Sequence, residues 1–407
     1  MSLPLVERIM LSHLLEGEVR QGHSVVLRVD RIYVQDGNAP SVARLFYEHR
    51  FSSISTPERI AVVIDHATLS PSAAFTNRIR EAEEFARSLK IPLFRAGAGI
   101  SHVIAREQGW YRPGDIVVGA DSHTCTGGAE QCLGLGLGAS DVVAAMVTGS
   151  IWAKVPRTRW IRTRGRPGRN AGAKDVMLML LARVGLREFL YQSLEWCGEW
   201  PASIDEDSAA TVANMTVETG AKCAFLPPRA NGPAGMREIV PAYEKDVVEL
   251  DLDGMPPFVA PPHSPANAVE LNRCAGQPID FVFVGSCTNG RLADLEETAA
   301  VLDHSPVDPR VHMVVAPGSR DVYVQALESG VIARLVKAGA VIAPPGCGPC
   351  VGTQGSVPGD GERVFTTMNR NFLGRMGNPR AAIWLGSPRV AAATAALGRI
   401  PREEDLP

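Results

Sequence analysis

Short apolar runs alternate with longer amphipathic segments along much of this chain, and this pattern restricts the possible folds more than any other feature. IAVVID (60–65) precedes AAFTNRIREAEEFARSLK (73–90), and DIVVGAD (115–121) precedes ASDVVAAMVTGSIWA (139–153). The short runs resemble buried strands in length and composition, and the longer segments have the apolar spacing of helices. Because this alternation is typical of βα units with parallel sheets, we expect an α/β fold.

Changes in composition divide the chain into three units. A basic, glycine-rich stretch at 161–175 interrupts the first series of strands and helices, and a proline-rich tract at 256–270 follows the second series. Stretches of this kind commonly lie between domains. We therefore predict three α/β units with mostly parallel sheets, covering residues 1–165, 166–275 and 276–407.

Charge and cysteine usage exclude several classes of protein. The 407 residues include 41 basic and 44 acidic side chains, with a net charge of -3, so a nucleic-acid partner is not expected. Charged residues interrupt the apolar positions near the N-terminus, and no stretch is apolar for long enough to span a membrane. Eight cysteines in so long a chain fit a reducing compartment, and we place the protein in the cytoplasm.

The cysteine pair in APPGCGPCVG, Cys347 and Cys350, has several possible chemistries. CGPC matches the redox dithiol of thioredoxin-type oxidoreductases, but the glycines and proline after Cys350 oppose the helix that such a site needs. Zinc would need four ligands, and no second pair stands at a suitable spacing. A dithiol oxidoreductase and a catalytically silent metal-binding or scaffold protein nevertheless remain alternatives at this point.

A third cysteine lies in a similar setting. Cys287, in VFVGSCTNG, follows an apolar strand in a glycine-flanked loop, as Cys347 does. Both loops would lie at the carboxyl ends of strands, where α/β proteins bind ligands. Three thiolates could hold three corners of an iron–sulfur cluster and leave one iron open to act as a Lewis acid. The remaining cysteines have no paired spacing and are assigned to packing: Cys125, Cys132, Cys197, Cys223 and Cys274.

Histidines and carboxylates follow the strands of the first unit. Asp65 and His66 end the run IAVVID, Asp121 and His123 end the run DIVVGA, and His102 lies in a third loop. Removing water from a carbon–carbon bond needs a proton for the leaving hydroxyl, a base for the carbon-bound proton and an electrophile. Histidines oriented by carboxylates suit the first of these tasks.

Four motifs in one order carry a resemblance to a known family. GADSHTCTGG (119–128), GSCTNGR (285–291), GCGPCVG (346–352) and NRNFLGR (369–375) resemble those of the aconitase superfamily, and the resemblance covers nearly the whole chain. The form that the chain most resembles is the large subunit of two-subunit hydro-lyases such as 3-isopropylmalate dehydratase. The resemblance implies aconitase-type α/β/α domains 1–3 around a central iron–sulfur cleft.

The resemblance also assigns roles to individual residues. It implies a [4Fe-4S] cluster with three cysteine ligands and one open iron, the ligands being Cys287, Cys347 and Cys350, with Asn369 close to the cluster. It implies three active-site histidines with carboxylate partners: His66, His102 and His123 with Asp65, Asp121 and Glu195. It implies substrate contacts from Gln35, Ser122, Arg370 and Arg375, and an arginine fork suits a carboxylate substrate.

The same resemblance implies a partner and a substrate class. Single-chain aconitases carry a further mobile domain, whereas this chain ends at Pro407, so we expect a separate small subunit to supply the swivelling domain. The expected reaction is reversible dehydration and hydration of a small hydroxy di- or tricarboxylate, most simply of the 3-isopropylmalate type used in amino-acid biosynthesis. Gln35 and Asp36 resemble the aconitase pattern, whereas 3-isopropylmalate dehydratases and homoaconitases more often have histidine at the position of the glutamine. The alternative is a homoaconitase, an aconitase-like enzyme or another branched-dicarboxylate hydratase.

Overall fold

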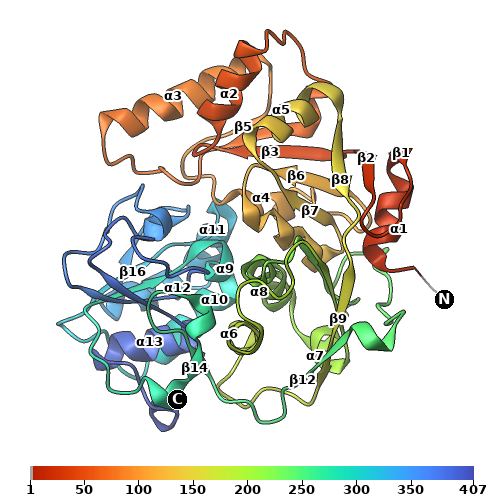
Figure 1. Cartoon of the computed structure of the whole chain (residues 1–407). Coiled ribbons are helices and arrows are strands. Elements are labelled where there is room, and N and C mark those ends of the chain that lie inside the picture. Colours follow the sequence, from red (N-terminus) through yellow and green to blue (C-terminus); the bar gives the residue numbers. More distant parts are fainter. Residues whose placement is uncertain (1–2) are drawn as a thin grey trace.

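The computed structural model describes residues 3–407, and three parallel sheets organise it (Figure 1). The first sheet has the strand order β5-β4-β3-β6-β7, and all its neighbouring pairs are parallel. Its strands are β3 (Arg31–Gln35), β4 (Ile60–Val63), β5 (Leu93–Phe94), β6 (Ile116–Gly119) and β7 (Leu133–Gly136). Its helices are α2 (Ala39–Glu48), α3 (Ala73–Ser88), α4 (Ser101–Glu107), the 3-10 helix η2 (Ser122–Glu130) and α5 (Ala139–Thr148).

Both faces of the first sheet are buried, which explains why its strands read as continuous apolar runs. Every residue of β4 and β6 is buried. Ile32 and Val34 of β3 pack in one apolar cluster together with α2, α3 and α5, whereas Tyr33 packs in another cluster with residues of α4. The alternation of side chains along β3 therefore joins the two helix layers through the sheet.

The second sheet is smaller and has the order β11-β10-β9-β12, again all parallel. Its strands are β9 (Thr158–Arg164), β10 (Ser193–Cys197), β11 (Cys223–Phe225) and β12 (Val247–Asp251). Its helices are α6 (Ala173–Val184), α7 (Glu199–Ser203), α8 (Glu206–Thr216) and the 3-10 helix η3 (Val217–Thr219). The sequence predicts a division at residue 165, but the structure pairs β9 with β10 and β12, so this strand opens the second unit instead of ending the first.

The third sheet has the order β17-β16-β15-β18-β19 and is also parallel throughout. Its strands are β15 (Phe281–Val284), β16 (His312–Val315), β17 (Val341–Ile342), β18 (Arg363–Thr366) and β19 (Ala382–Leu385). Its helices are α9 (Ser286–Asn289), α10 (Leu292–Leu302), α11 (Arg320–Glu328), α12 (Val331–Lys337), the 3-10 helix η7 (Gly348–Val351) and α13 (Pro388–Leu397).

Smaller elements complete the chain. Helix α1 (Leu5–Ser12) precedes an antiparallel sheet of β1 (Leu14–Gly17), β2 (Ser24–Arg28) and β8 (Ser150–Lys154), and β13 (Phe258–Val259) pairs with β14 (Val269–Glu270). Further 3-10 helices are η1 (Pro57–Arg59), η4 (Glu244–Asp246), η5 (Pro265–Asn267), η6 (Leu271–Arg273) and η8 (Glu403–Asp405). The expected α/β fold with mostly parallel sheets is confirmed. Over residues 3–407, no helix is both long and apolar enough to cross a membrane.

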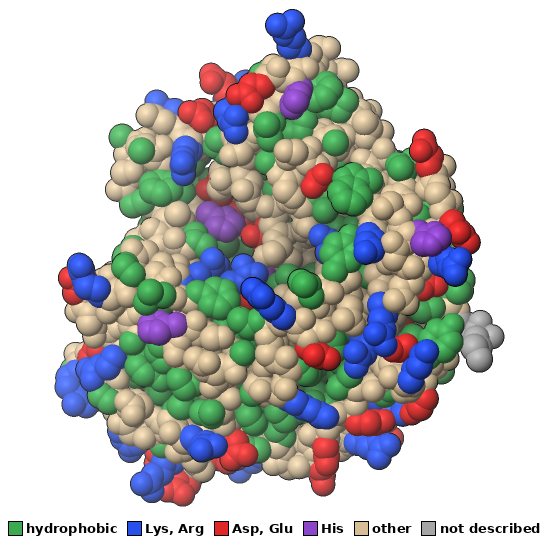
Figure 2. All heavy atoms as spheres, viewed as in Figure 1, with side chains coloured by type: hydrophobic (Ala, Val, Ile, Leu, Met, Phe, Trp, Pro, Cys, Tyr) green, Lys and Arg blue, Asp and Glu red, His purple; other side chains and the backbone are tan. Residues whose placement is uncertain are grey.

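The first and third sheets meet at the carboxyl ends of their strands. The Ile100 amide donates to the Gly318 carbonyl at 2.8 Å, and the Cys347 amide donates to the Asp65 carbonyl at 2.9 Å. Gly99 has a φ of +134°, and a Cβ there would lie 2.5 Å from the backbone of Ser319, so only glycine permits this close approach. The surface is hollowed between the upper and the lower left lobes, and His, Asp or Glu, and Lys or Arg side chains gather in the hollow (Figure 2).

Candidate active site

Each of the two five-stranded sheets begins in its middle strand and adds strands to either side, which creates a switch point between neighbouring strands. In the first sheet the switch lies between β3, which ends at Gln35 and is followed by Asp36, and β6, which is followed by Asp121. In the third sheet it lies between β15, which is followed by Cys287, and β18, which is followed by Asn369. The predicted site residues therefore stand where α/β sheets bind ligands.

Asp121 joins two of the predicted histidines. Its Oδ1 lies 3.0 Å from His102 Nε2 and 3.3 Å from His123 Nδ1, and it also accepts the His123 amide at 2.8 Å. Burial raises the pKa of Asp121, but hydrogen bonds and positive charge from the two histidines outweigh burial and hold the pKa well below its usual range. Asp121 is therefore a carboxylate that can stabilise a proton on either imidazole.

The other nitrogens of these histidines also have partners. His102 Nδ1 lies 2.8 Å from Tyr33 Oη, which in turn lies 2.6 Å from Tyr111 Oη. His123 Nε2 lies 2.8 Å from Glu218 Oε1. Both imidazoles are thus fixed at both ring nitrogens, which sets their orientation and restricts their tautomers.

Glu218 connects this network to the third unit. Its carboxylate accepts from Arg370 Nε at 2.8 Å, and Arg370 Nη2 donates to Ser122 Oγ at 3.0 Å. Burial raises the pKa of Glu218, but the bonds from His123 and the charge of Arg370 lower it further than burial raises it. Two predicted substrate contacts, Ser122 and Arg370, thereby lie beside the histidine network.

Asp65 and His66 form a second pair. Asp65 Oδ1 lies 2.5 Å from His66 Nδ1, and Asp65 Oδ2 accepts the Ser101 amide at 2.9 Å. Asp36 supports the same turn, because its carboxylate accepts the amides of His66 at 3.0 Å and Ala67 at 2.9 Å. One ligand atom from each of Asp65, His66 and Cys347 lies within 4.8 Å of the others, so this histidine faces a predicted cluster ligand.

The predicted ligand thiols are all buried and belong to one apolar cluster. Asn214 Nδ2 and Asn369 Nδ2 donate to Cys287 Sγ at 3.2 and 3.4 Å, and Arg375 Nη2 donates to Cys350 Sγ at 3.2 Å. Burial raises the pKa of Cys287 to about 12. A buried thiol becomes a thiolate when a metal shares its charge, and N–H donors at the sulfur suit a metal-bound thiolate. This donor set fits an iron–sulfur cluster.

The Cys347–Cys350 loop differs from a dithiol oxidoreductase site. Cys347 precedes η7, a four-residue 3-10 helix, and the next α-helix after η7 in the described chain is α13. Gly348 has a φ of +60°, and a Cβ there would lie 2.7 Å from the Phe283 ring. The loop therefore folds closely against β15, which also leads to Cys287, and lacks the helix N-terminus that lowers a dithiol pKa.

Several polar atoms beside these groups lack a partner among the described residues. They are buried, and they belong to predicted site residues: Gln35 Oε1, Asn369 Oδ1 and Arg375 Nε. Gln35 Nε2 donates to Ser101 Oγ at 3.0 Å, which fixes the amide while leaving its oxygen available. Buried unpaired groups are costly in a folded protein, so their presence on three predicted site residues is evidence for a bound polar group.

Glu195 requires a correction. The sequence predicts it as a carboxylate partner of an active-site histidine, but it lies within β10, where its Oε1 accepts the Val6 amide at 3.3 Å. Burial raises its pKa to about 7. Glu195 thus joins the N-terminal helix to the second sheet, and the carboxylate on His123 is Glu218. The error arose because the local match around Glu195 is weak.

Sequence reasoning also missed Asn214 and Tyr33. Asn214 is fully buried, and Glu218 stands four positions further along the chain, so the two polar side chains follow one face of α8 and its extension η3. Buried polar residues at this spacing on an otherwise apolar helix face were the available signal. Tyr33 lies between Ile32 and Val34 in β3, where the sequence gives no reason to distinguish a tyrosine from an ordinary core residue.

Comparison with known proteins shows the family of the chain. The family model described as "Aconitase family (aconitate hydratase)" matches residues 7–232 and 272–398. The 3-isopropylmalate dehydratase large subunit 1 of Thermotoga maritima is 39% identical, covering 98% of each chain. The protein of the same name from Pyrococcus abyssi is 36% identical over the whole of both chains. Large subunit 2 from Archaeoglobus fulgidus is 38% identical over 99% of this chain and 100% of its own.

A solved structure supports the fold. The crystal structure of Thermococcus kodakaraensis aconitase X (holo-form) covers 85% of this chain and 84% of its own, with a TM-score of 0.51 and 12% sequence identity. Family membership favours the hydro-lyase interpretation over a dithiol oxidoreductase. The chain is therefore a member of the aconitase family and an enzyme of its hydro-lyase class.

Proposed function

We propose that this chain is the large subunit of a two-subunit iron–sulfur hydro-lyase that reversibly dehydrates a small hydroxydicarboxylate of the 3-isopropylmalate type. Relatives named as large subunits of 3-isopropylmalate dehydratase match almost the full length of the chain. The small subunit would supply the swivelling domain and complete the site over the hollow in Figure 2. The observation that carries the proposal is the convergence of three buried thiols and a histidine–carboxylate network where two sheets meet.

Aconitase-family proteins bind a [4Fe-4S] cluster, and Cys287, Cys347 and Cys350 would be its protein ligands here. When bound, the cluster supplies a Lewis acid at its open iron, which polarises a substrate hydroxyl and carboxylate. The N–H donors of Asn214, Asn369 and Arg375 at the sulfurs support this assignment.

We assign proton transfer to the leaving hydroxyl to His66. Its Nδ1 is held by Asp65, its side chain is 20% exposed, and it faces Cys347. His102 and His123, by contrast, have protein partners at both nitrogens and are almost fully buried. Their proposed role is to hold the Asp121 network in place and to stabilise a proton near the substrate.

Arg370 and Arg375 would bind the substrate carboxylates, with Gln35 and Ser122 as further contacts. Arg370 remains 22% exposed, and Arg375 Nε lacks a protein partner among the described residues. An arginine fork binds a carboxylate through two parallel N–H donors, which orients it as well as attracting it. Gln35 Oε1 can accept a hydrogen bond from a substrate hydroxyl.

Anaerobic co-purification with the small subunit tests the proposal. We expect brown protein with iron and acid-labile sulfide, and alkene absorbance when 3-isopropylmalate is added. The hydroxytricarboxylates citrate and homocitrate and other branched hydroxydicarboxylates should be screened in parallel, since Gln35 resembles the aconitase pattern. The large subunit alone should show almost no turnover. Colourless, iron-free protein, or full activity without a partner, would contradict the proposal.

A further inference from the structure

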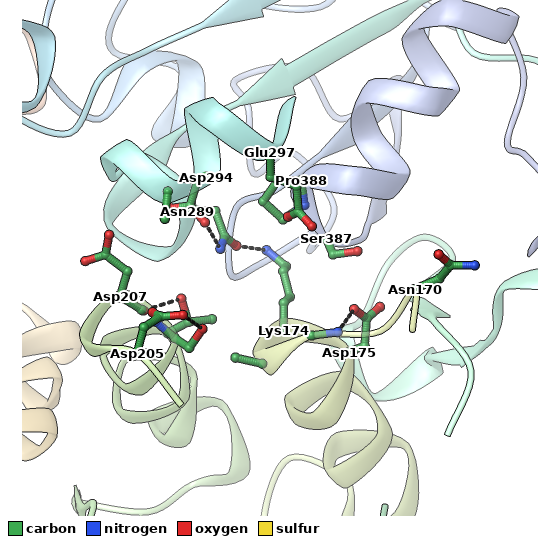
Figure 3. A pocket seen from close by; sticks show the side chains of 15 residues that line it. Asn170, Lys174, Asp175, Asp205, Asp207, Asn289, Asp294, Glu297, Ser387 and Pro388 are labelled. Atoms are coloured by element: carbon green, nitrogen blue, oxygen red, sulfur yellow. Dashed lines mark hydrogen bonds between the residues drawn. The ribbon is translucent and has the colours of Figure 1, made fainter. Parts of the chain in front are cut away.

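A lysine is buried behind the predicted cluster loop. Lys174, near the start of α6, is 2% exposed and projects into a cavity of about 260 Å³ between the second and third units (Figure 3). Burying an ammonium group is costly unless its protons find acceptors. The next residue, Asp175, is also buried, and the three positions after it are apolar: Val176, Met177 and Leu178.

The ammonium group has three oxygen acceptors. Lys174 Nζ donates to Asn289 Oδ1 at 3.2 Å, to the Met368 carbonyl at 2.5 Å and to the Thr367 carbonyl. Because an ammonium carries three N–H donors, all of its protons are used. Over residues 3–407, neither carbonyl accepts another hydrogen bond. Lys174 is thus the donor that satisfies both.

These acceptors belong to the two loops that flank the switch point of the third sheet. Asn289 stands two residues after Cys287, and Met368 directly precedes Asn369 and Arg370. The two loops also contact each other, because the Gly285 amide donates to Thr367 Oγ1 at 2.9 Å. Lys174 therefore ties the loop of a predicted ligand to the loop of a predicted substrate arginine.

We propose that Lys174 is a positioning residue that holds these two loops together from behind, so that Asn369 reaches Cys287 and Arg370 reaches Ser122. This inference rests on the proposed function. Without the ammonium, two buried carbonyls lose their donor, and the chain from 367 to 370 can move away from the Cys287 loop.

The test compares Lys174→Met with Asp175→Asn in the anaerobically purified two-subunit complex. Asp175 is the adjacent buried residue, and its carboxylate accepts the amides of Gly172 and Phe258, neither of which belongs to the two loops. Both variants replace a buried ionisable side chain in the same turn of α6. Asp175→Asn therefore controls for general destabilisation of the second unit.

We expect Lys174→Met to raise amide hydrogen exchange in peptides covering 366–371 and to release iron about tenfold faster than wild type. It should also raise KM about tenfold, with a smaller change in kcat, since a lost hydrogen bond to a charged group corresponds to roughly a tenfold change. Asp175→Asn should lower the melting temperature and leave all three quantities within about twofold of wild type. Lys174→Arg, which keeps the charge and the donors, should restore most of the loss.

Unchanged exchange at 366–371 and wild-type iron release in Lys174→Met would overturn the inference, as would equal effects of Asp175→Asn. If Lys174→Met does not fold, amide hydrogen exchange at 366–371 is measured in Lys174→Arg and Asn289→Ala instead. Wild-type protection of these peptides in Asn289→Ala would count against the inference. A wild-type complex without iron would refute the proposed function itself. An iron-loaded wild type with an indistinguishable Lys174→Met variant would refute only the role of Lys174.

Discussion

The first and third sheets share one strand order but contribute different chemistry to the site. The loops that follow the strands of the first sheet carry imidazoles and carboxylates, such as His66 and Asp121. The loops that follow the strands of the third sheet carry thiols, amides and arginines, such as Cys287 and Arg370. Their common topology places both sets at a switch point, so the same fold serves proton chemistry on one side and ligand binding on the other.

Helix α8 belongs to the second unit and touches both sets. Its Asn214 donates to Cys287, and Glu218, just beyond its end, accepts from His123 and Arg370. We therefore expect three kinds of variant. Substitutions beside the third sheet should remove the cofactor, and substitutions beside the first sheet should keep the cofactor but impair proton transfer. Substitutions between the two sheets should weaken the contacts that join the two sets of residues.

The largest effect is expected from the third sheet. Cys287→Ala should abolish the visible absorbance and bound iron of the complex and lower kcat/KM by at least about 1,000-fold, since metal polarisation contributes several kcal/mol. Cys274→Ala is the matched control, because Cys274 is buried to a similar degree but packs in a different apolar cluster of the third unit. Equal iron content in the two variants would contradict the claim that the loops of the third sheet hold the cofactor.

A first-sheet variant should separate the two functions. Asp121→Asn removes the charge shared by His102 and His123, and we expect kcat to fall about 100-fold, the range typical of general acid–base groups. Iron content and the visible spectrum should remain those of wild type. Loss of the spectrum in this variant would mean that the first sheet also holds the cofactor.

Two glutamates test the correction made by the structure. Glu218→Gln should lower kcat/KM about 30-fold, because the bonds to His123 and Arg370 lose their charge. Glu195→Gln should leave activity near wild type and change the pH dependence of stability instead. A large loss of activity in Glu195→Gln, with iron retained, would restore the sequence-based assignment.

The sign of that pH effect follows from the pKa of Glu195, which burial raises to about 7 in the folded chain. Below its ordinary value of about 4.3 the group is protonated in both the folded and unfolded states and has no effect. As the pH rises from there to about 7, the unfolded state ionises first and the folded state loses stability, by on the order of 3 kcal/mol. Glu195→Gln should abolish this loss, as denaturant unfolding at pH 5 and pH 8 would reveal.

Candidate site residues in the loops after strands could be predicted from the sequence, whereas those on α8 and its extension η3 could not. Cys287, Cys347 and Cys350 stand in glycine-rich motifs directly after apolar strands, and the topology then brings such motifs together. The correct partner of His123 is 95 residues away on a helix, where no local motif marks it. Glu195 has only a weak local match and lies within β10, and sequence spacing does not reveal which face of that strand is nearest the site.

The smallest effect is expected at Tyr33, deep in the first sheet. Because the Asp121 carboxylate can only accept, His102 Nε2 carries the proton in this hydrogen bond. His102 Nδ1 therefore accepts a hydrogen bond from the Tyr33 hydroxyl. Tyr33→Phe removes this donor, and we expect kcat to fall about fivefold, equivalent to about 1 kcal/mol, with KM and the visible spectrum unchanged. Tyr47→Phe, at an exposed tyrosine bonded to Ser88, is the control and should have no effect. Since Tyr33 touches neither the thiols nor the arginines, a changed spectrum would show that the two sheets are more tightly coupled than their separate chemistry implies.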